Sequence, residues 1–296
     1  MSTTETPIAA PAAAPLAETT RLGAVHLTVT ELDRSVAFYQ DALGLRLHRR
    51  EDPVAAMGAG EEDLVVLVEE QKARRAGRHA GLYHYALLMP SREELARALQ
   101  RLAATRTPIE GASDHGISEA IYLPDPDGNG IELAADRPRG AWPKLETLGR
   151  PDPLDLHGLL GTLGDAEPVR HADPGTTVGH VHLHVNDIAA ARHFYEEVLG
   201  FHAETAMSNA VFVSVAGYHH HLGFNTWRGA GIPPAPASET VVGLRHWTIL
   251  LDGATELASV RSRLEAAGVE IAERSGGLLV HDPAGIPVLL TPAPAR

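Results

Sequence analysis

The sequence repeats itself, and this repetition restricts the fold more than any other feature. A glycine-led apolar segment, a Phe-Tyr pair and a Leu-Gly pair occur twice at a constant offset, in residues 23–44 and in residues 179–200. A second repeat starts at Gly81 and at Gly243 and closes on an Asp-Pro pair at 125–126 and at 282–283. Self-similarity at a fixed period indicates one structural unit used several times. The 296 residues therefore divide into four units of roughly 50 residues, which we name A, B, A′ and B′ in chain order.

Each unit opens with a strand and continues with a helix. In residues 25–29 and 181–185 every second residue is apolar, as a half-buried strand requires. Helices are expected over 32–43 and 188–199, where apolar residues recur at helical spacing and a glycine follows at the C-cap. Further short strands are expected at 63–69, 120–123, 130–134, 210–215 and 220–225. Each unit is therefore predicted to be βαβββ, and the fold to belong to the α+β class.

The composition along the chain predicts a division into two halves. Residues 1–20 are rich in Ala, Pro and Thr without the charge and apolar pattern of a signal peptide, so we expect a disordered tail. Units A and B are predicted to form a first domain over 21–139, and A′ and B′ a second domain over 178–296. Residues 140–177, rich in Gly, Pro and Asp, are expected to link them.

Charge and cysteine content exclude several classes of function. Lys and Arg number 25 against 38 Asp and Glu, a formal charge of -13, which disfavours a nucleic-acid partner. No apolar run approaches the roughly 18 residues of a membrane-spanning helix, so a cytoplasmic protein without a membrane partner is expected. The absence of cysteine excludes disulfides, zinc-thiolate sites, iron–sulfur clusters and thiol nucleophiles. A bound metal would therefore need nitrogen and oxygen ligands, and the 17 histidines are clustered.

Strand alternation places these histidines on common faces. If the apolar residues of 181–185 pack against the helix of their unit, His180, His182 and His184 face the opposite side. The same alternation over 218–225 groups His221 with Asn225 on the polar face. A sheet with one apolar face and one histidine-lined face predicts a concave wall around a polar pocket.

These residues resemble the vicinal oxygen chelate superfamily, and four tandem βαβββ units are similar to the type I extradiol ring-cleaving dioxygenases. The resemblance covers about 21–137 and 178–293. It is carried by the Gly-x-x-His strands, by the Phe-Tyr-x-x-x-Leu-Gly helices and by residues 121–132, where Tyr122 precedes Glu132 across an Asp-Pro-Asp-Gly-Asn turn. It implies that the units pair into two barrel-like, half-open sheets.

The resemblance also implies a metal site. In such a site the metal is bound by one His from the first strand of each of two paired units and by a Glu from the last strand of one of them. Glu132 is the one carboxylate at such a position, because Leu289 takes its place in B′. Two imidazoles and one carboxylate leave adjacent positions of Fe(II) open for a substrate and O₂. His84 and Glu132, both in B, are therefore two predicted ligands.

The third ligand is a choice between His26 of A and His182 of A′. The short connection between A and B favours His26. Complementarity favours His182, because A′ also carries histidines where, by resemblance, extradiol enzymes place an acid–base His, whereas residues 63–69 of A carry none. We therefore predict that B pairs with A′ and that His84, Glu132 and His182 bind the metal.

The resemblance assigns roles to three further residues. His221 is the predicted base, since strand alternation directs it to the pocket, with the choice among His219, His220 and His221 left open. Tyr122 resembles a tyrosine that hydrogen-bonds the bound substrate oxygen. His115 resembles a second histidine near the substrate.

The predicted function is an Fe(II)-dependent extradiol dioxygenase of the EC 1.13.11 type, acting on a catechol-type diol with O₂ in aromatic catabolism. One alternative is a glyoxalase-like isomerase or lyase that uses Mn(II), Zn(II) or Ni(II). Another is a metal-free drug-binding protein, similar to the bleomycin-resistance proteins. The partners expected are a small aromatic substrate and O₂. The substituents of the substrate and the oligomeric state, a homo-oligomer included, are left open.

Overall fold

The computed structural model describes residues 14–75, 77–144 and 151–294, and its elements follow the four units. Unit A comprises β1 (Arg21–Val29), α1 (Leu32–Asp41), β2 (Arg46–Glu51), β3 (Val54–Gly58) and β4 (Asp63–Glu69). Unit B comprises β5 (Gly81–Met89), α2 (Arg92–Ala104), β6 (Gly111–Asp114), β7 (Ser118–Pro124) and β8 (Gly130–Asp136). The prediction of βαβββ units is confirmed.

The second half repeats this order with small changes. Unit A′ comprises β10 (Thr177–His184), α4 (Ile188–Arg192), the π-helical η3 (His193–Leu199), β11 (His202–Ala206), β12 (Ala210–Ser214) and β13 (Leu222–Asn225). Unit B′ comprises β14 (Gly243–Leu251), α5 (Gly253–Ala266), β15 (Ala272–Arg274), β16 (Gly277–His281) and β17 (Pro287–Pro292). Between the halves lie η1 (Arg139–Ala141), β9 (Asp152–Pro153) and α3 (Leu156–Gly161).

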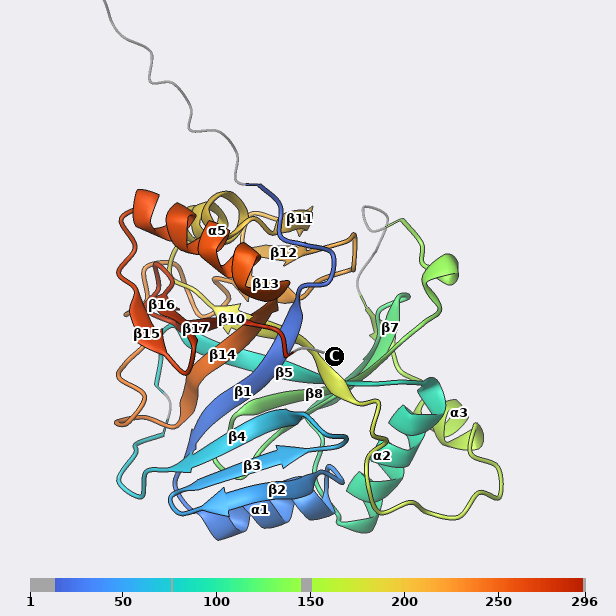
Figure 1. The fold of residues 1–296 in the computed structure, drawn as a ribbon. Helices are drawn as coiled ribbons and strands as arrows, with labels where there is room; N and C mark the ends of the chain where they lie inside the picture. Colours follow the sequence, from blue (N-terminus) through green and yellow to red (C-terminus); the bar gives the residue numbers. More distant parts are fainter. Residues whose placement is uncertain (1–13, 76, 145–150, 295–296) are drawn as a thin grey trace, which may run out of the picture.

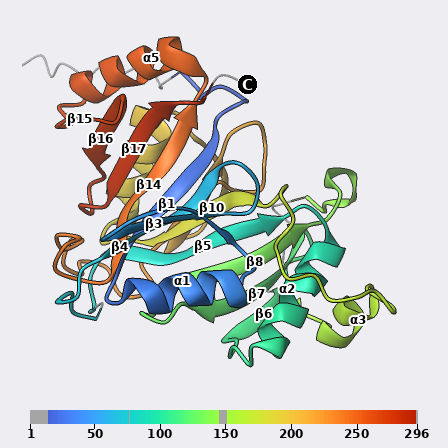
Figure 2. The same cartoon turned by 60° about the horizontal axis from the view of Figure 1, so that its bottom comes forward.

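The units pair into two sheets, and each sheet takes one unit from each half of the chain. One sheet has the order β15-β16-β17-β14-β1-β4-β3-β2, which joins B′ to A. The other has the order β11-β12-β13-β10-β5-β8-β7-β6-β9, which joins A′ to B. Antiparallel pairing of β1 with β14 and of β10 with β5 closes the two junctions. In Figures 1 and 2 these four strands run through the middle of the molecule.

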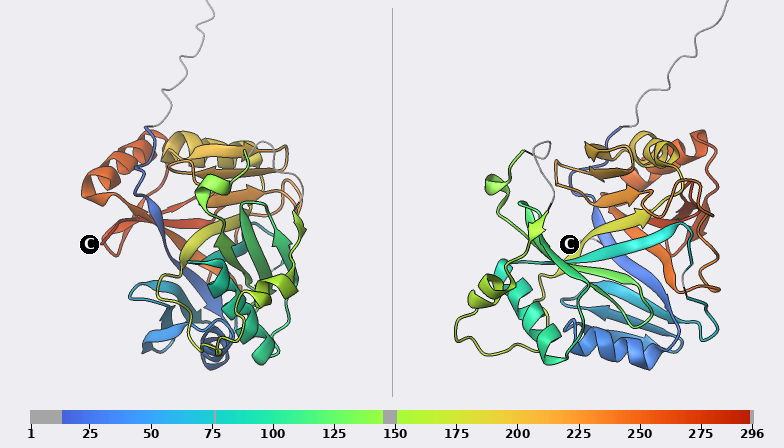
Figure 3. Two further views of the ribbon diagram at one scale, coloured as in Figure 1. Left: turned by 90° about the vertical axis from the view of Figure 1, so that its right-hand side faces the viewer. Right: turned by 180° about the vertical axis from the view of Figure 1, so that it is seen from behind.

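The helices flank the sheets and supply apolar faces. Figure 1 shows α5 at one end of the molecule and α1 with α2 at the other, and Figure 3 shows β10 beside β5 from behind. Helix α2 begins after Ser91, whose side chain accepts a hydrogen bond from the Glu94 backbone N–H. Its Leu95, Leu99 and Leu102 recur at helical spacing and are buried. In the described parts of the chain, none of the helices has the length and apolar character of a membrane span.

A buried tyrosine–aspartate contact explains two of the sequence repeats. The Tyr39 hydroxyl of A donates to Asp125 of B at 3.3 Å, and the Tyr195 hydroxyl of A′ donates to Asp282 of B′ at 2.9 Å. Each aspartate also caps its own turn by accepting backbone N–H bonds, from Asn129 in the first half for example. These contacts join A to B and A′ to B′, whereas the sheets join A to B′ and B to A′. The two halves are therefore interlocked.

The expected tail and the expected linker carry contacts where the structure describes them. Residues 1–13 of the expected tail lie outside the described residues. Leu16 is buried, and its backbone N–H donates to the carbonyl of Gly200 at 3.0 Å. In the expected linker, the buried Leu159 of α3 packs in the apolar core. The domain boundaries inferred from the sequence, at residues 21–139 and 178–296, therefore stay predictions.

Candidate metal site

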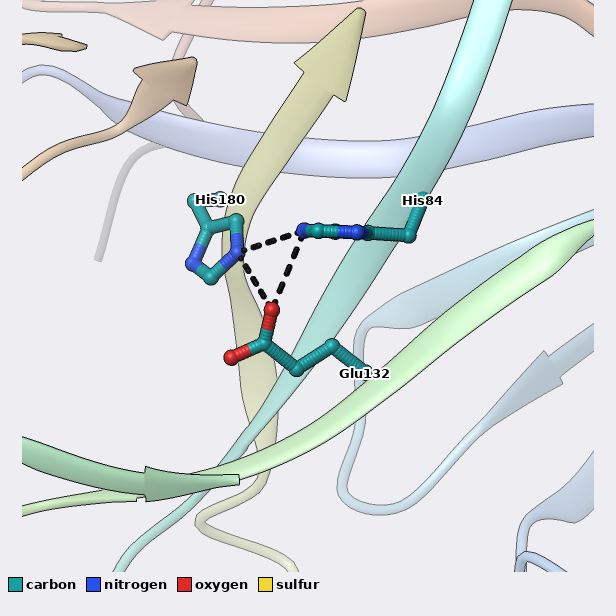
Figure 4. A group of neighbouring side chains, drawn as sticks. All are labelled: His84, Glu132 and His180. Atoms are coloured by element: carbon teal, nitrogen blue, oxygen red, sulfur yellow. Dashed lines mark hydrogen bonds and ion pairs between the residues drawn. The ribbon is translucent and has the colours of Figure 1, made fainter. Parts of the chain in front are cut away.

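Three neighbouring strands position a group of buried ligand-type side chains. In the antiparallel pairing of β10 with β5, His180 lies opposite Ala86, and in the parallel pairing of β5 with β8, Ala86 lies opposite Glu132. His180, Ala86 and Glu132 therefore form one cross-strand row. The side chain between His180 and Glu132 in this row is the methyl group of Ala86. His84 is the next residue on the same face of β5. Figure 4 shows the three side chains converging from the three strands.

The spacing of the donor atoms fits a metal ion. His84 Nε2 lies 3.0 Å and His180 Nε2 lies 3.1 Å from Glu132 Oε2, and the two nitrogens are 3.3 Å apart. A metal with bonds of about 2.1 Å separates adjacent ligand atoms by about 3.0 Å in octahedral and about 3.4 Å in tetrahedral geometry. All three separations fall within that range. Residues His84, Glu132 and His180 thus have the donor types and the arrangement of a three-ligand metal site.

The electrostatics of the group also suit a cation. His84 is 7 % exposed, and Glu132 and His180 are each 4 % exposed. Burial on its own would raise the pKa of Glu132, but the His180 and His84 rings hold this pKa well below its usual range. Burial lowers the pKa of His180. An ionised carboxylate and a neutral imidazole are the protonation states in which these groups bind metals.

The group forms part of the wall of a cavity of about 790 Å³. This volume lies in the range of about 300–1,000 Å³ typical of small-molecule sites. Aromatic side chains of Tyr83, Phe212 and Trp227 line it. Tyr83 is 40 % and Trp227 is 49 % exposed, so both rings reach solvent at the mouth. The cavity is therefore large enough for an aromatic ring beside His84, His180 and Glu132.

Tyr122 and His115, for which roles near a substrate are expected from the sequence, both line this cavity. Tyr122 on β7 lies directly opposite Glu132 on β8. Its hydroxyl is 2.8 Å from His115 Nε2. Burial, followed by the charge of Glu132, raises the pKa of Tyr122. The Tyr122 hydroxyl is therefore protonated, and it is held beside the group formed by His84, Glu132 and His180.

His182, the third ligand favoured by the sequence, lines the cavity but is not part of the converging group. Its Nε2 lies 2.9 Å from Asn225 Nδ2, which donates to it. Gly223 leaves room for this orientation, since a Cβ there would lie 3.1 Å from the His182 ring. The ring of His182 is thus directed to β13, and His180 takes the place beside Glu132. In the register, His182 lies opposite His84 and one row away from Glu132.

His221, the predicted base, does not line the cavity, whereas His220 does. The His221 ring accepts a hydrogen bond from the Val215 backbone N–H at 3.3 Å. The His220 ring lies beside His180, with 4.1 Å between ring centroids. The strand alternation used for this prediction does not extend to these residues, because β13 begins at Leu222 and the preceding segment is a turn with positive φ at 216–217.

Comparison with known proteins assigns the chain to a family. The sequence model of the Glyoxalase/Bleomycin resistance protein/Dioxygenase superfamily matches residues 21–133 and 177–288. The chain belongs to this superfamily. A catechol-2,3-dioxygenase of Bacillus subtilis (strain 168) is 40 % identical over 274 residues, which cover 90 % of this chain and 95 % of that protein. The resemblance inferred from the sequence is confirmed.

Shorter and more distant members of the superfamily are also similar. The glutathione transferase FosA of Serratia marcescens is 30 % identical over 115 residues, covering 36 % of this chain and 77 % of that protein. The crystal structure of glyoxalase I from Zea mays covers 93 % of this chain and 92 % of its own, with a TM-score of 0.59 and 17 % identity. The likeness to glyoxalase I concerns the fold.

The other sheet of this superfamily member carries a stacked histidine pair. His26 lies opposite His246 in the pairing of β1 with β14, and the two rings stack at 3.9 Å. Burial lowers the pKa of His26 to about 4 and that of His246 to about 2. The position equivalent to Glu132 is Leu289, which pairs with Thr248 as Glu132 pairs with Ala86. His26 thus lies in the sheet that lacks the Glu132 equivalent.

Proposed function

We propose that this protein is an iron(II)-dependent extradiol dioxygenase that opens the ring of a catechol-type substrate with O₂. The observation that carries the proposal is the convergence of His84, His180 and Glu132 on the wall of a cavity with an aromatic lining. The 40 % identity to a catechol-2,3-dioxygenase over most of both chains supports it.

We propose Fe(II) as the metal, held by His84 Nε2, His180 Nε2 and Glu132 Oε2. Two imidazoles and one carboxylate on one face are typical of non-haem Fe(II) oxygenases, and they leave neighbouring positions open. When bound, iron would supply the electron transfer between the aromatic ring and O₂ that ring opening requires. The single carboxylate keeps the net charge of the site low enough for an anionic catecholate.

The base we propose is His220. Its ring lies beside His180 and lines the cavity, so a catechol at the ligand group would be within its reach. A neutral imidazole accepts a proton at its unprotonated nitrogen and returns it later. His220 thereby would take the proton of a substrate hydroxyl and give it back during ring opening.

Tyr122 is proposed to fix the position of the substrate. Because its pKa is raised, the hydroxyl keeps its proton and can donate to a substrate oxygen. His115 Nε2, at 2.8 Å, holds this hydroxyl in place. The rings of Phe212 and Trp227 would pack against the aromatic substrate and exclude water from it.

The test of this function is oxygen consumption by the iron-loaded protein. The protein is loaded with Fe(II) under anaerobic conditions, mixed with catechol and 3- and 4-substituted catechols, and exposed to O₂. We expect consumption of one O₂ for each yellow ring-fission product formed, and loss of both in Glu132→Gln. Oxygen consumption without a ring-fission product, or activity that Glu132→Gln retains, would contradict the proposal.

The identity of the metal is tested separately. Protein stripped of metal is reconstituted with Fe(II), Mn(II), Zn(II) or Ni(II), and ring cleavage is measured with each. We expect cleavage with Fe(II) and none with Zn(II), because Zn(II) has no accessible redox change. Isomerase activity towards a hemithioacetal with Ni(II) or Zn(II), without ring cleavage by Fe(II), would instead assign the glyoxalase-like alternative.

A further inference from the structure

A chain of hydrogen bonds runs from a carboxylate on β8 to the cavity. Asp136, the last residue of β8, lies with Oδ1 at 3.0 Å from His219 Nε2. His219 Nδ1 in turn lies 2.8 Å from His220 Nδ1. His220 lines the cavity beside His180. The order is therefore Asp136, His219, His220 and then the substrate cavity.

The direction of these hydrogen bonds follows from what each group can donate. A carboxylate accepts hydrogen bonds, so His219 must donate to Asp136 from Nε2. In a neutral His219 the other nitrogen, Nδ1, is then an acceptor. The contact between the two Nδ1 atoms therefore requires that His220 donates from its Nδ1. This leaves Nε2 of His220 as the unprotonated nitrogen.

The surroundings of His219 hold this arrangement in place. The His219 side chain is 3 % exposed, and the Trp142 ring packs on it with 5.3 Å between centroids. The Tyr218 hydroxyl donates to the second oxygen of Asp136 at 2.8 Å. The carboxylate thus has both oxygens engaged, and Asp136 of unit B is tied to the turn of unit A′ that carries the three consecutive histidines.

We propose that Asp136 and His219 are positioning residues that hold His220 in the tautomer protonated at Nδ1, so that its Nε2 is the proton acceptor for the substrate. This rests on the proposed function, in which His220 is the base. Neither Asp136 nor His219 is among the residues that line the cavity, so both act through His220.

Replacing Asp136 by asparagine tests the chain of bonds with almost no change in shape. Because the Tyr218 hydroxyl donates to the other oxygen of this side chain, we expect the Asn oxygen to face Tyr218 and the Asn amide N–H to donate to His219 Nε2. A neutral His219 then carries its proton on Nδ1 and donates to His220 Nδ1, so that His220 carries its own proton on Nε2. We expect kcat for ring cleavage to fall by roughly 100-fold, since a positioned base contributes about 100- to 10,000-fold. KM, iron content and Tm are expected to stay near those of the unchanged protein.

Tyr218→Phe is the matched control. It removes the other hydrogen bond of the same carboxylate and leaves the bond to His219, so kcat is expected to stay within about fivefold, the effect of one ordinary hydrogen bond. An equal loss of kcat in Tyr218→Phe and Asp136→Asn would assign Asp136 a merely structural role and overturn the proposal.

The tautomer itself is measured by ¹⁵N NMR on metal-stripped protein labelled in histidine, with the His220 signals assigned from a His220→Gln variant. We expect the proton of His220 on Nδ1, and on Nε2 in Asp136→Asn. A proton on Nε2 in the unchanged protein, or the same tautomer in both, would overturn the proposal. Because this readout needs no turnover, it decides the tautomer even if no catechol is cleaved, a result that would refute the proposed function alone.

Discussion

The choice between His180 and His182 as metal ligand gives a direct prediction. Both rings are on β10, both are 4 % exposed, and both line the cavity. His180→Ala and His182→Ala therefore leave similar holes in similar surroundings. The two variants differ in which contact is lost: His180 Nε2 is 3.1 Å from Glu132, whereas His182 Nε2 accepts a hydrogen bond from Asn225.

The magnitude follows from the number of donors that remain. His180→Ala leaves His84 and Glu132 as two donors instead of three. Loss of a residue that only supports a ligand typically costs about 10- to 100-fold in metal affinity, so loss of a ligand is expected to cost at least about 100-fold. This corresponds to about 2.7 kcal/mol of binding free energy. His182→Ala is expected to weaken binding by no more than about tenfold.

The assay is an anaerobic titration of metal-stripped protein with Fe(II) in competition with a chelator of known affinity. Thermal unfolding of both metal-stripped variants controls for damage to the fold, and we expect similar Tm values. Stronger loss of affinity in His182→Ala than in His180→Ala would refute the reasoning from strand register.

Three further predictions concern the packing of the site, its entrance and the buried aspartate of the second half. Ala86→Leu places a large side chain between His180 and Glu132, so we expect loss of Fe(II) binding with a folded protein; retained binding would show that the row is not closely packed. Trp227→Ala removes a ring at the cavity mouth, so we expect KM for catechol to rise by about 5- to 10-fold with kcat little changed, whereas an unchanged KM would place the substrate elsewhere. Burial raises the pKa of Asp282 to about 6, so the native state binds its proton more tightly than the unfolded chain, and the free energy of unfolding should fall as pH rises from about 4 to 6. The full decrease in the free energy of unfolding is about 3 kcal/mol. Denaturant unfolding over this pH range should show this decrease in the unchanged protein and not in Asp282→Asn. Parallel pH profiles in the two proteins would contradict the raised pKa of Asp282.

Much of the fold could be predicted because the repeats report on packing. The Phe-Tyr pair and the Asp-Pro pair recur together because the tyrosine of one unit bonds the aspartate of the next, as in Tyr39 and Asp125. The alternation in β10 and the helical spacing in α1 identify local structure for the same reason. The pairing of B with A′ could be argued from the distribution of histidines and Glu132. The packing of Leu16 could not, since no periodic pattern surrounds it.

The candidate site was less accessible to sequence reasoning, because it depends on register and on a turn. His180, His182 and His184 share one face, so alternation alone does not choose among them. Alignment on Gly-x-x-His selects the residue opposite His84, whereas the antiparallel register places His180 in the row of Glu132. The signal that could have found it is Ala86, the small residue that leaves room between them.

The prediction of the base shows a different limit. Extending strand alternation through residues 218–225 favours His221, but β13 begins only at Leu222, after a turn at 216–217, and His220 lines the cavity whereas His221 does not. Gly217, which has positive φ next to these residues, is the sequence feature that signals the break.

The central claim is that one metal ion is bound jointly by His84, His180 and Glu132. The most direct measurement is a crystal structure of protein loaded anaerobically with Fe(II), with anomalous diffraction recorded on both sides of the iron absorption edge. We predict a single strong iron peak within bonding distance of the Nε2 atoms of both histidines and of the Glu132 carboxylate. An iron peak between His26 and His246, or a filled site in which Glu132 makes no bond to the metal, would contradict the account.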